Sequence, residues 1–279
     1  MRPISYRDLA TLDDFAGVVE LEREIWGPGY DEVVPVPILA VTVLRGGILI
    51  GAFEGDPSTA SGSRMIAFVY SLPAIKHGKP TAWSHMLGVL DAFRSAGVGR
   101  ELKRLQRERA LAMGLDLVEW TYDPMQALNA HLNFTKLGVV AEEYEVNVYG
   151  TSSSPLHRGN PTDRFVAEWW IRTPRVEQRM TGSVPMASVL TVEPTVRTTS
   201  AGEWLEPAAW DLSLDAKRIS VEIPTDFTGM LARAPDLALK WRMATRELFT
   251  TYFSRGYQAV EFFLNRESRK GEYLLTRQP

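Results

Sequence analysis

The chain has 279 residues, of which 45% are hydrophobic and 23% are charged, and this composition is typical of a folded protein with one large domain or two smaller ones. It contains no cysteine, which excludes disulfides, thiolate metal sites and a cysteine nucleophile. The formal net charge of −3 argues against binding to a nucleic-acid backbone or to an anionic membrane.

The N-terminal residues are polar where a secretory signal would carry an apolar core. The most apolar window, residues 33–53, is interrupted by Pro35, Pro37, Arg45, Gly46 and Gly47, which does not suit a membrane-spanning helix. We therefore expect a cytoplasmic protein without a membrane segment.

Apolar periodicity predicts the elements of the first part of the chain. A strand is expected at 4–8, a helix at 12–26, a short helix before Gly46-Gly47, and strands at 47–54, 65–72 and 83–90. A helix at 99–113 and a strand at 115–122 follow, and the order strand, helix, strand predicts a crossover between a parallel pair. Further along, we expect a helix at 125–137 and strands at 139–149 and 164–171.

The segment 172–186 carries few apolar residues and marks the predicted domain boundary, with a first domain at 1–175 and a smaller α/β domain at 183–279. In the second domain the pattern predicts strands at 187–192 and 218–223, a helix at 237–255, and a hairpin of 259–264 with 272–276. The helix has a large apolar stripe, and any exposed part of it would mark a contact between two copies of the chain, as in a homodimer. Arg242 and Arg246 on this helix are expected to form ordinary salt bridges.

The segment with the clearest chemistry joins the predicted strand at 83–90 to the helix that starts at Gly99. Its turn contains Arg94, Gly97 and Gly99. Glycine lets the backbone approach a ligand closely, and a helix N-terminus presents unpaired N–H groups that bind anions. The turn lacks the Lys-Ser/Thr pair of a P-loop and the spacing of a dinucleotide fingerprint, so we expect a phosphate site of another kind. A strand-to-helix turn without a ligand is the alternative.

The sequence Arg94-Ser95-Ala96-Gly97-Val98-Gly99 resembles the Q/R-x-x-G-x-G/A signature of the Gcn5-related N-acyltransferases (GNAT), and the order of elements over residues 3–171 is similar as well. The resemblance implies a mixed α/β fold: a central, mostly antiparallel sheet with one splayed parallel strand pair, followed here by a smaller α/β domain. It also implies that acyl-coenzyme A (acetyl- or succinyl-CoA) is the co-substrate. The cofactor contacts carried over from the family are Leu87, Gly88, Val89, Arg94, Ser95, Ala96, Gly97, Val98, Gly99, Arg100, Asn129 and Asn133.

One position departs from the family pattern. Many members have a tyrosine that protonates the leaving thiolate where this chain has Phe134. Phenylalanine cannot donate a proton, so the proton could come from Tyr122 or from water. Alternatively the thiolate could leave without a proton donor, because the pKa of a thiol is about 8.5.

Two side chains are candidates for catalysis. Strand alternation places Trp83, His85, Leu87 and Val89 on one face, and the pKa of histidine suits proton transfer, so His85 is a candidate base. Glu119 on the neighbouring parallel strand is the second candidate, with a structural salt bridge as its alternative. For His85, a structural role with a hydrogen bond to a neighbouring group is as well supported by the sequence as the role of a base.

The histidines and acidic residues lack ligand spacing, so we predict no catalytic metal. His157 and Arg158, in the polar loop after residue 150, are read as solvated loop residues, with a role above a substrate pocket as the alternative. We expect an N-acyltransferase that moves an acyl group to the primary amine of a small molecule, such as an amino acid, by direct attack. A non-catalytic coenzyme A sensor or assembly subunit is the first alternative, and a protein-interaction module without coenzyme A affinity is the second.

Overall fold

The computed structural model describes residues 3–27, 30–55, 63–94, 96–150, 159–182 and 192–277. Its contacts divide these residues into two compact units. The first unit runs up to Trp120 and includes Trp170–Arg172, and the second contains the described residues of 121–169 and 173–277. The division of the sequence into domains 1–175 and 183–279 stays a prediction.

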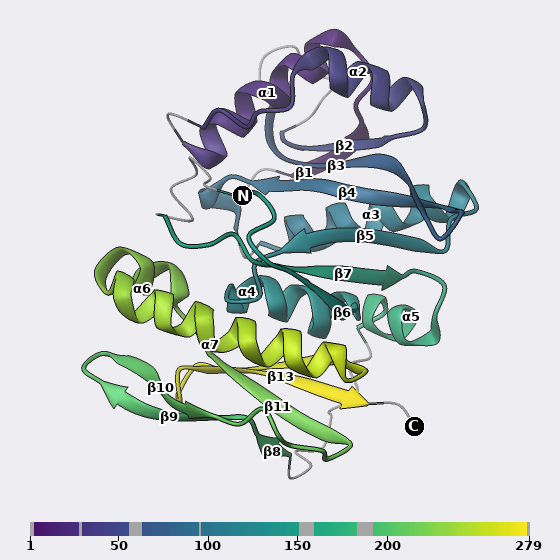
Figure 1. The fold of residues 1–279 in the computed structure, drawn as a ribbon. Coiled ribbons are helices and arrows are strands. Elements are labelled where there is room, and N and C mark those ends of the chain that lie inside the picture. The colour runs from purple at the N-terminus through teal and green to yellow at the C-terminus, as the bar shows by residue number, and fades with distance from the viewer. Residues whose placement is uncertain are drawn as a thin grey trace. The chain divides into compact units, whose positions relative to one another are not determined.

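The first unit contains strands, helices and one 3₁₀ turn (Figure 1). In chain order they are β1 (Ile4–Asp8), α1 (Leu12–Trp26), α2 (Val36–Leu44), β2 (Ile48–Glu54), β3 (Arg64–Lys76), β4 (Lys79–Val89), η1 (Asp91–Phe93), α3 (Val98–Ala112) and β5 (Leu117–Tyr122). Each helix and strand predicted for this part of the sequence is confirmed, and β3 and β4 are both longer than expected.

The start of α1 shows how local sequence sets an element. The Thr11 hydroxyl accepts a hydrogen bond from the Asp14 amide at 3.2 Å, and the Asp14 carboxylate accepts one from the Thr11 amide at 3.1 Å. This capping box pairs amides that would otherwise lack partners at the helix end. Arg7 on β1 also binds the Asp14 carboxylate at 2.6 Å, which ties the helix start to the sheet.

The hairpin between β3 and β4 turns through His77 and Gly78, whose φ angles are 48° and 77°. Two consecutive positive φ values match the right-handed twist of the flanking strands. The two residues therefore form a tight turn that suits this hairpin.

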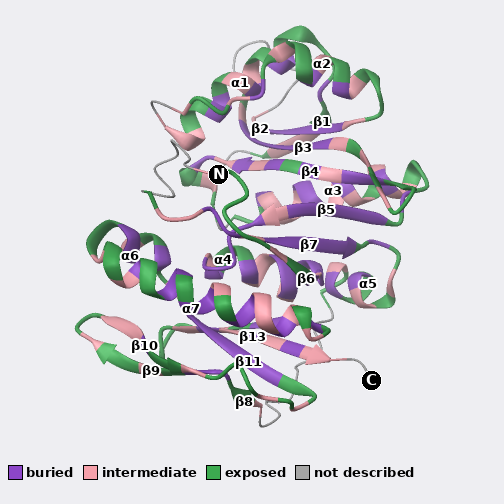
Figure 2. Cartoon of the chain, viewed as in Figure 1, coloured by how far each residue is buried: buried purple, intermediate pink, exposed green. Residues whose placement is uncertain are grey.

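The strands of the first unit follow the order β1-β2-β3-β4-β5. Neighbours are antiparallel except β4 and β5, which form the predicted parallel pair, with α3 as the crossover. On one face Tyr70 of β3 donates to Thr42 of α2, and on the other Ser71 accepts from Gln106 of α3. Helices α1 and α2 therefore cover one face and α3 the other, and Figure 2 shows exposed residues on the outer side of α1 and α2.

The second unit has a sheet with the order β7-β6-β12-β13-β11-β8 and a separate hairpin of β9 and β10. Its elements are α4 (Ala127–Ala130), the π-helix η2 (His131–Leu137), β6 (Val140–Glu145), β7 (Arg164–Trp170), α5 (Pro174–Met180), β8 (Glu193–Pro194), β9 (Val196–Ala201), β10 (Trp204–Trp210), β11 (Arg218–Pro224), α6 (Phe227–Arg233), α7 (Pro235–Ser254), β12 (Tyr257–Asn265) and β13 (Lys270–Arg277). The predicted long helix and terminal hairpin are confirmed.

Some elements of this unit were not predicted. Helix α5 lies in the segment interpreted as a boundary, although Thr173 caps it and Pro174 occupies its first turn, which is a recognised start signal. The β9–β10 hairpin and α6 were also missed. The strand expected at 187–192 falls, up to residue 191, outside the described residues.

Helix α7 buries most of its apolar stripe. Trp241, Phe249 and Tyr252 are fully buried, whereas Leu239 and Met243 are 44% and 39% exposed. The expected salt bridges of this helix are confirmed: Arg242 binds Asp123 at 2.7 Å and Arg246 binds Asp163 at 2.8 Å. Among the described residues, no helix is long and apolar enough to cross a membrane.

Gly88 of β4 provides a test of the packing between the sheet and α1. A Cβ at this position would lie 2.7 Å from Ile25 Cδ1 and 2.9 Å from Phe68 Cε1. We expect Gly88→Ala to lower the free energy of unfolding by about 1–3 kcal/mol, measured by urea denaturation, because the added methyl overpacks a closed contact. Gly17→Ala on α1 is the control, since its Cβ would meet only Met65 Cε at 3.6 Å. Equal stability of Gly88→Ala and the wild type would contradict this packing.

Candidate functional site

The central feature of the first unit is the point where β4 and β5 separate. Their register pairs are Ala82 with Val118 and Trp83 with Glu119. Beyond Trp83, β4 continues to Val89 and no further pairing with β5 occurs among the described residues. This edge of β4 is therefore not paired with β5 from Ser84 to Val89.

A β-bulge lies on β4 at the same place. Tyr70 pairs with Met86 and Ser71 pairs with Ser84, which leaves His85 as the extra residue. A bulge bends its strand and interrupts the alternation of side chains.

The bulge corrects one expectation from the sequence. Leu87 and Val89 face α3, since a Cβ on Gly99 would lie 3.7 Å from each of their side chains. The ring of His85 instead packs edge-on against Tyr70, with centroids 6.0 Å apart, on the face covered by α1 and α2. The prediction that Trp83, His85, Leu87 and Val89 share one face is therefore wrong, because strict alternation does not hold through a bulge.

The turn after β4 leads directly into α3. Gly97 is the N-cap of the helix with a φ of 82°, and it offers no side chain to the first amides of α3. A Cβ on Gly97 would meet no other atom within 4 Å, so the space beside the helix N-terminus is open. Ala96 and Gly97 are exposed, Val98 is buried, and Ser95 lies outside the described residues. This combination of exposed amides and a helix N-terminus suits a diphosphate.

Arg94 lies at the rim of this turn. Its side chain is 57% exposed and forms an ion pair of 2.8 Å with the exposed carboxylate of Asp91. Its Nε also donates to the carbonyl of Val89 at 3.3 Å. Exposed ion pairs contribute little to stability, so the guanidinium can exchange this partner for a phosphate at small cost.

The two candidate catalytic residues lie on the face opposite α3. His85 is exposed to solvent at the bulge, and partial desolvation by the surrounding protein lowers the pKa of its imidazole. Glu119 is 5% exposed and accepts a hydrogen bond from Lys76 Nζ at 2.9 Å. The geometry of Glu119 is that of a buried ion pair, the alternative considered from the sequence.

A buried lysine on α3 was not found from the sequence. Lys103 is 3% exposed, and its Nζ donates to Ser84 Oγ at 2.9 Å and to Gln106 Oε1 at 3.1 Å. The same Nζ lies 3.6 Å from the centroid of the Trp120 ring. Desolvation lowers the pKa of this amine well below its ordinary value.

A buried glutamate on α1 was also missed. Glu22 is 0% exposed, and its Oε2 accepts a hydrogen bond from the amide of Val34 at 2.9 Å. Its Oε1 has no hydrogen-bond partner among the described residues. Burial raises the pKa of this carboxyl to about 7, and the bond from Val34 opposes that shift.

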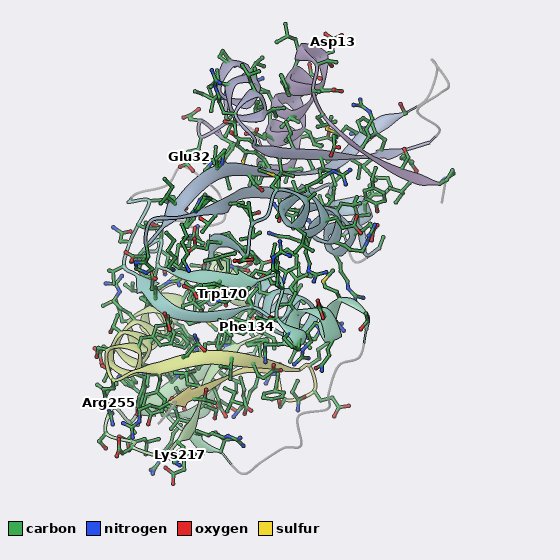
Figure 3. All side chains as sticks on the ribbon, turned by 90° about the vertical axis from the view of Figure 1, so that its right-hand side faces the viewer. Asp13, Glu32, Phe134, Trp170, Lys217 and Arg255 are labelled. Atoms are coloured by element: carbon green, nitrogen blue, oxygen red, sulfur yellow. The ribbon has the colours of Figure 1, made fainter. Side chains whose placement is uncertain are left out.

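The remaining predicted residues belong to the second unit. Asn129 is exposed on α4, and Asn133 is buried in η2 with its carbonyl accepting from the amide of Val139 at 3.1 Å. Phe134, labelled in Figure 3, is fully buried, and its ring packs against Tyr122 and Tyr273 with centroids 6.4 and 5.6 Å away. Both asparagines stay predicted cofactor contacts.

Tyr122 is one of the alternative proton donors for the leaving thiolate that the sequence offers. Its hydroxyl lies 3.2 Å from that of Tyr273, which itself donates to the carbonyl of Pro124 at 2.7 Å. Burial raises the pKa of both phenols well above the ordinary value, which makes them weaker acids. Tyr122 is therefore a poorer proton donor than an exposed tyrosine.

No group of three or more histidine or acidic side chains that could hold a metal occurs in the part of the chain that the structure describes. The loop with His157 and Arg158 lies outside that part.

The raised pKa of Glu22 has a measurable consequence for stability. Between pH 4.5 and about 7 the folded carboxyl keeps its proton while the unfolded one loses it, so the free energy of unfolding of the wild type falls as pH rises. We expect Glu22→Gln to gain stability relative to the wild type over this range, by roughly 3 kcal/mol at most. Denaturant titrations at several pH values measure this difference, with the exposed Glu20→Gln on the same helix as control. A constant difference across the range would rule out the shift.

The lowered pKa of Lys103 predicts the opposite trend. Between the folded pKa and the ordinary value of 10.5, the unfolded chain binds one more proton, so the stability of the wild type rises with pH. Because methionine cannot titrate, Lys103→Met should lose stability relative to the wild type as pH increases toward 10.5. Thermal unfolding across this range tests the trend. Lys240→Met, at an exposed site on α7, serves as control and should show no such trend.

Several solved structures are similar to part of this chain. One is the NatC complex bound to Gag peptide and CoA, with 14% identity, 60% of this chain and 98% of that chain covered, and a TM-score of 0.47. A second is a putative acetyltransferase of the GNAT family from Desulfovibrio desulfuricans, at 15% identity, with 61% and 99% covered and a TM-score of 0.45. A third is a putative acetyltransferase from Salmonella typhimurium with its cofactor acetyl-CoA, at 16% identity, with 60% and 94% covered and a TM-score of 0.47.

No protein-family model matches the sequence, and no curated protein matches it. At these identities and TM-scores, the likeness assigns neither a family nor an activity to this chain.

Proposed function

We propose that the chain is an acyl-CoA-dependent N-acyltransferase. The observation that carries the proposal is the open edge of β4 between Ser84 and Val89, which leads to the exposed helix N-terminus at Gly97. An extended arm with amide groups can pair with a free strand edge, and a diphosphate can bind the amides beyond it. Coenzyme A combines these two chemistries in one molecule.

Within this proposal, the residues of β4 and α3 have separate tasks. The edge from Leu87 to Val89 binds the pantetheine arm, and the amides of Gly97 to Arg100, with Arg94 at the rim, bind the diphosphate. Coenzyme A supplies the activated thioester when it is bound. A backbone amide of the unpaired edge of β4 can donate to the thioester carbonyl, which stabilises the negative charge that develops on its oxygen.

The acceptor amine attacks the thioester carbon directly in this proposal. His85 lies at the bulge on the face opposite α3, where its imidazole can take the proton that the amine releases. The acceptor is a primary amine of a small molecule such as an amino acid, with a peptide amine as the competing class, and the donor is acetyl- or succinyl-CoA. A panel of amines and acyl donors with detection of the released thiol identifies both substrates.

A non-catalytic coenzyme A sensor is the second candidate. The burial of Phe134 among aromatic rings favours it, because no hydroxyl is present at the position where many GNAT enzymes carry their proton donor. Tight coenzyme A binding without thiol release from any donor and amine would select the sensor.

Gly97 provides a matched test of the diphosphate site. Gly97 and Gly114 lie beyond the two ends of α3 with φ angles of 82° and 77°, and a Cβ on either would meet no other atom within 4 Å. Both substitutions to alanine should therefore cost the same stability, about 1–2 kcal/mol. Only Gly97→Ala places a methyl beside the proposed diphosphate, so we expect a loss of coenzyme A affinity of at least about 10-fold by calorimetry, against no change for Gly114→Ala. Equal affinity in the two variants would refute the proposed location.

A further inference from the structure

Lys103 occupies the point where β4 and β5 diverge. Ser84, which receives a hydrogen bond from Lys103 Nζ, directly follows the last residue of β4 that pairs with β5. Trp120, whose ring lies under the same Nζ, directly follows the last residue of β5 that pairs with β4. A single amine is thus held between the first unpaired residues of both strands.

The position of Lys103 on α3 connects it with the diphosphate site. Gly99 and Lys103 are four residues apart and therefore lie on the same side of the helix. Gly99 packs beside Leu87 and Val89, and Lys103 packs beside Ser84, so the helix follows β4 from its end to the bulge. An arm that starts at the helix N-terminus and runs along the edge of β4 for about 16 Å, five strand residues, brings its far end to Ser84.

Two neutral side chains accept hydrogen bonds from the Lys103 amine. Ser84 and Gln106 accept its hydrogen bonds, and the Gln106 amide donates to Ser71 at 2.5 Å and to Ser84 at 2.9 Å. This network fixes the position of the nitrogen, because each of its members is buried and hydrogen-bonded. An ammonium group held in such surroundings is a stronger acid than one in water.

We propose that Lys103 is the general acid for the leaving thiolate, a role that Phe134 cannot fill. The inference rests on the proposed acyl transfer. The amine nitrogen forms a bond to the thioester carbon, the carbon–sulfur bond breaks, and the sulfur takes a proton from the Lys103 ammonium. The proton released by the acceptor nitrogen passes to His85 or solvent, and water returns a proton to Lys103.

Several other charged or titratable groups belong to α3 and to the strands of the sheet that it covers. His85 of β4, Glu119 of β5 and Lys76 of β3 all lie on the opposite face of the sheet. On α3 itself, the Arg107 guanidinium donates to the carbonyl of Ile171 at 2.8 Å, and Arg100 lies near the helix start. A substitution of Lys103 therefore removes a titration on the α3 face of the sheet and leaves the titration of His85 on the other face in place.

The first test measures the thiol of bound coenzyme A and needs no turnover. A cation within about 4–6 Å lowers the pKa of a thiol by about 1 to 3, so wild-type protein should lower the pKa of the bound thiol, followed by ultraviolet absorbance of the thiolate. Lys103→Met should restore the pKa to that of free coenzyme A, and Lys103→Gln, which keeps a hydrogen bond to Ser84, should do the same. The control Lys240→Met should behave as the wild type does.

The outcomes separate the two proposals. Absence of coenzyme A binding in the wild type would overturn the proposed function. Normal binding with the same thiol pKa in the wild type and both Lys103 variants would overturn the role of Lys103 alone. The second test is the pH profile of acyl transfer: the wild-type rate should fall as Lys103 loses its proton at high pH, and Lys103→Gln should lose this dependence together with about 100-fold in kcat. A reduced rate with an unchanged pH profile would show that Lys103 acts only on the structure.

Discussion

The early separation of β4 from β5 is the constraint on which the candidate site depends. A parallel pair bridged by a helix normally continues its ladder along both strands, but here it ends at Trp83 and Glu119. The bulge at His85 bends β4 directly after the last pair, and α3 follows the outer part of β4. The unpaired strand edge and the helix N-terminus that form the proposed cofactor site are both consequences of this one geometric change.

Burying ionisable groups in the sheet region where β4 and β5 separate costs free energy, and packing alone does not explain why they are there. Lys103 and Glu22 are almost wholly removed from water, on opposite faces of the same sheet, and burial shifts the pKa of each toward its neutral form. An apolar residue of similar volume at either position would avoid this desolvation. Buried ionisable groups with shifted pKa values are typical of sites where protons move. Their placement beside β3 and β4 is therefore consistent with a chemical role for this part of the sheet.

Local sequence predicted the elements well because the relevant signals are local. Gly97 and the stop at Gly114 delimit α3, and the order strand, helix, strand predicted the parallel pair. The bulge could not be predicted in this way, because strand periodicity gives no signal for the extra residue at His85, which only the observed pairing of β3 with β4 shows. Lys103 was missed because a lysine on an amphipathic helix resembles a solvated residue, and only the packing of α3 shows that it points to Ser84 and Trp120.

The position of Phe134 limits where the proton for a leaving thiolate can originate. The ring lies in an aromatic cluster of the second unit, and the two phenols that it contacts are buried with raised pKa values. A phenol with a raised pKa is a weak acid toward a thiolate whose own pKa is about 8.5. Within the first unit, an ammonium with a lowered pKa stands where β4 and β5 diverge. The lowered pKa makes the Lys103 ammonium a stronger acid than an ordinary lysine, whereas the raised pKa values make both phenols weaker acids, so α3 is the better-suited source of the proton.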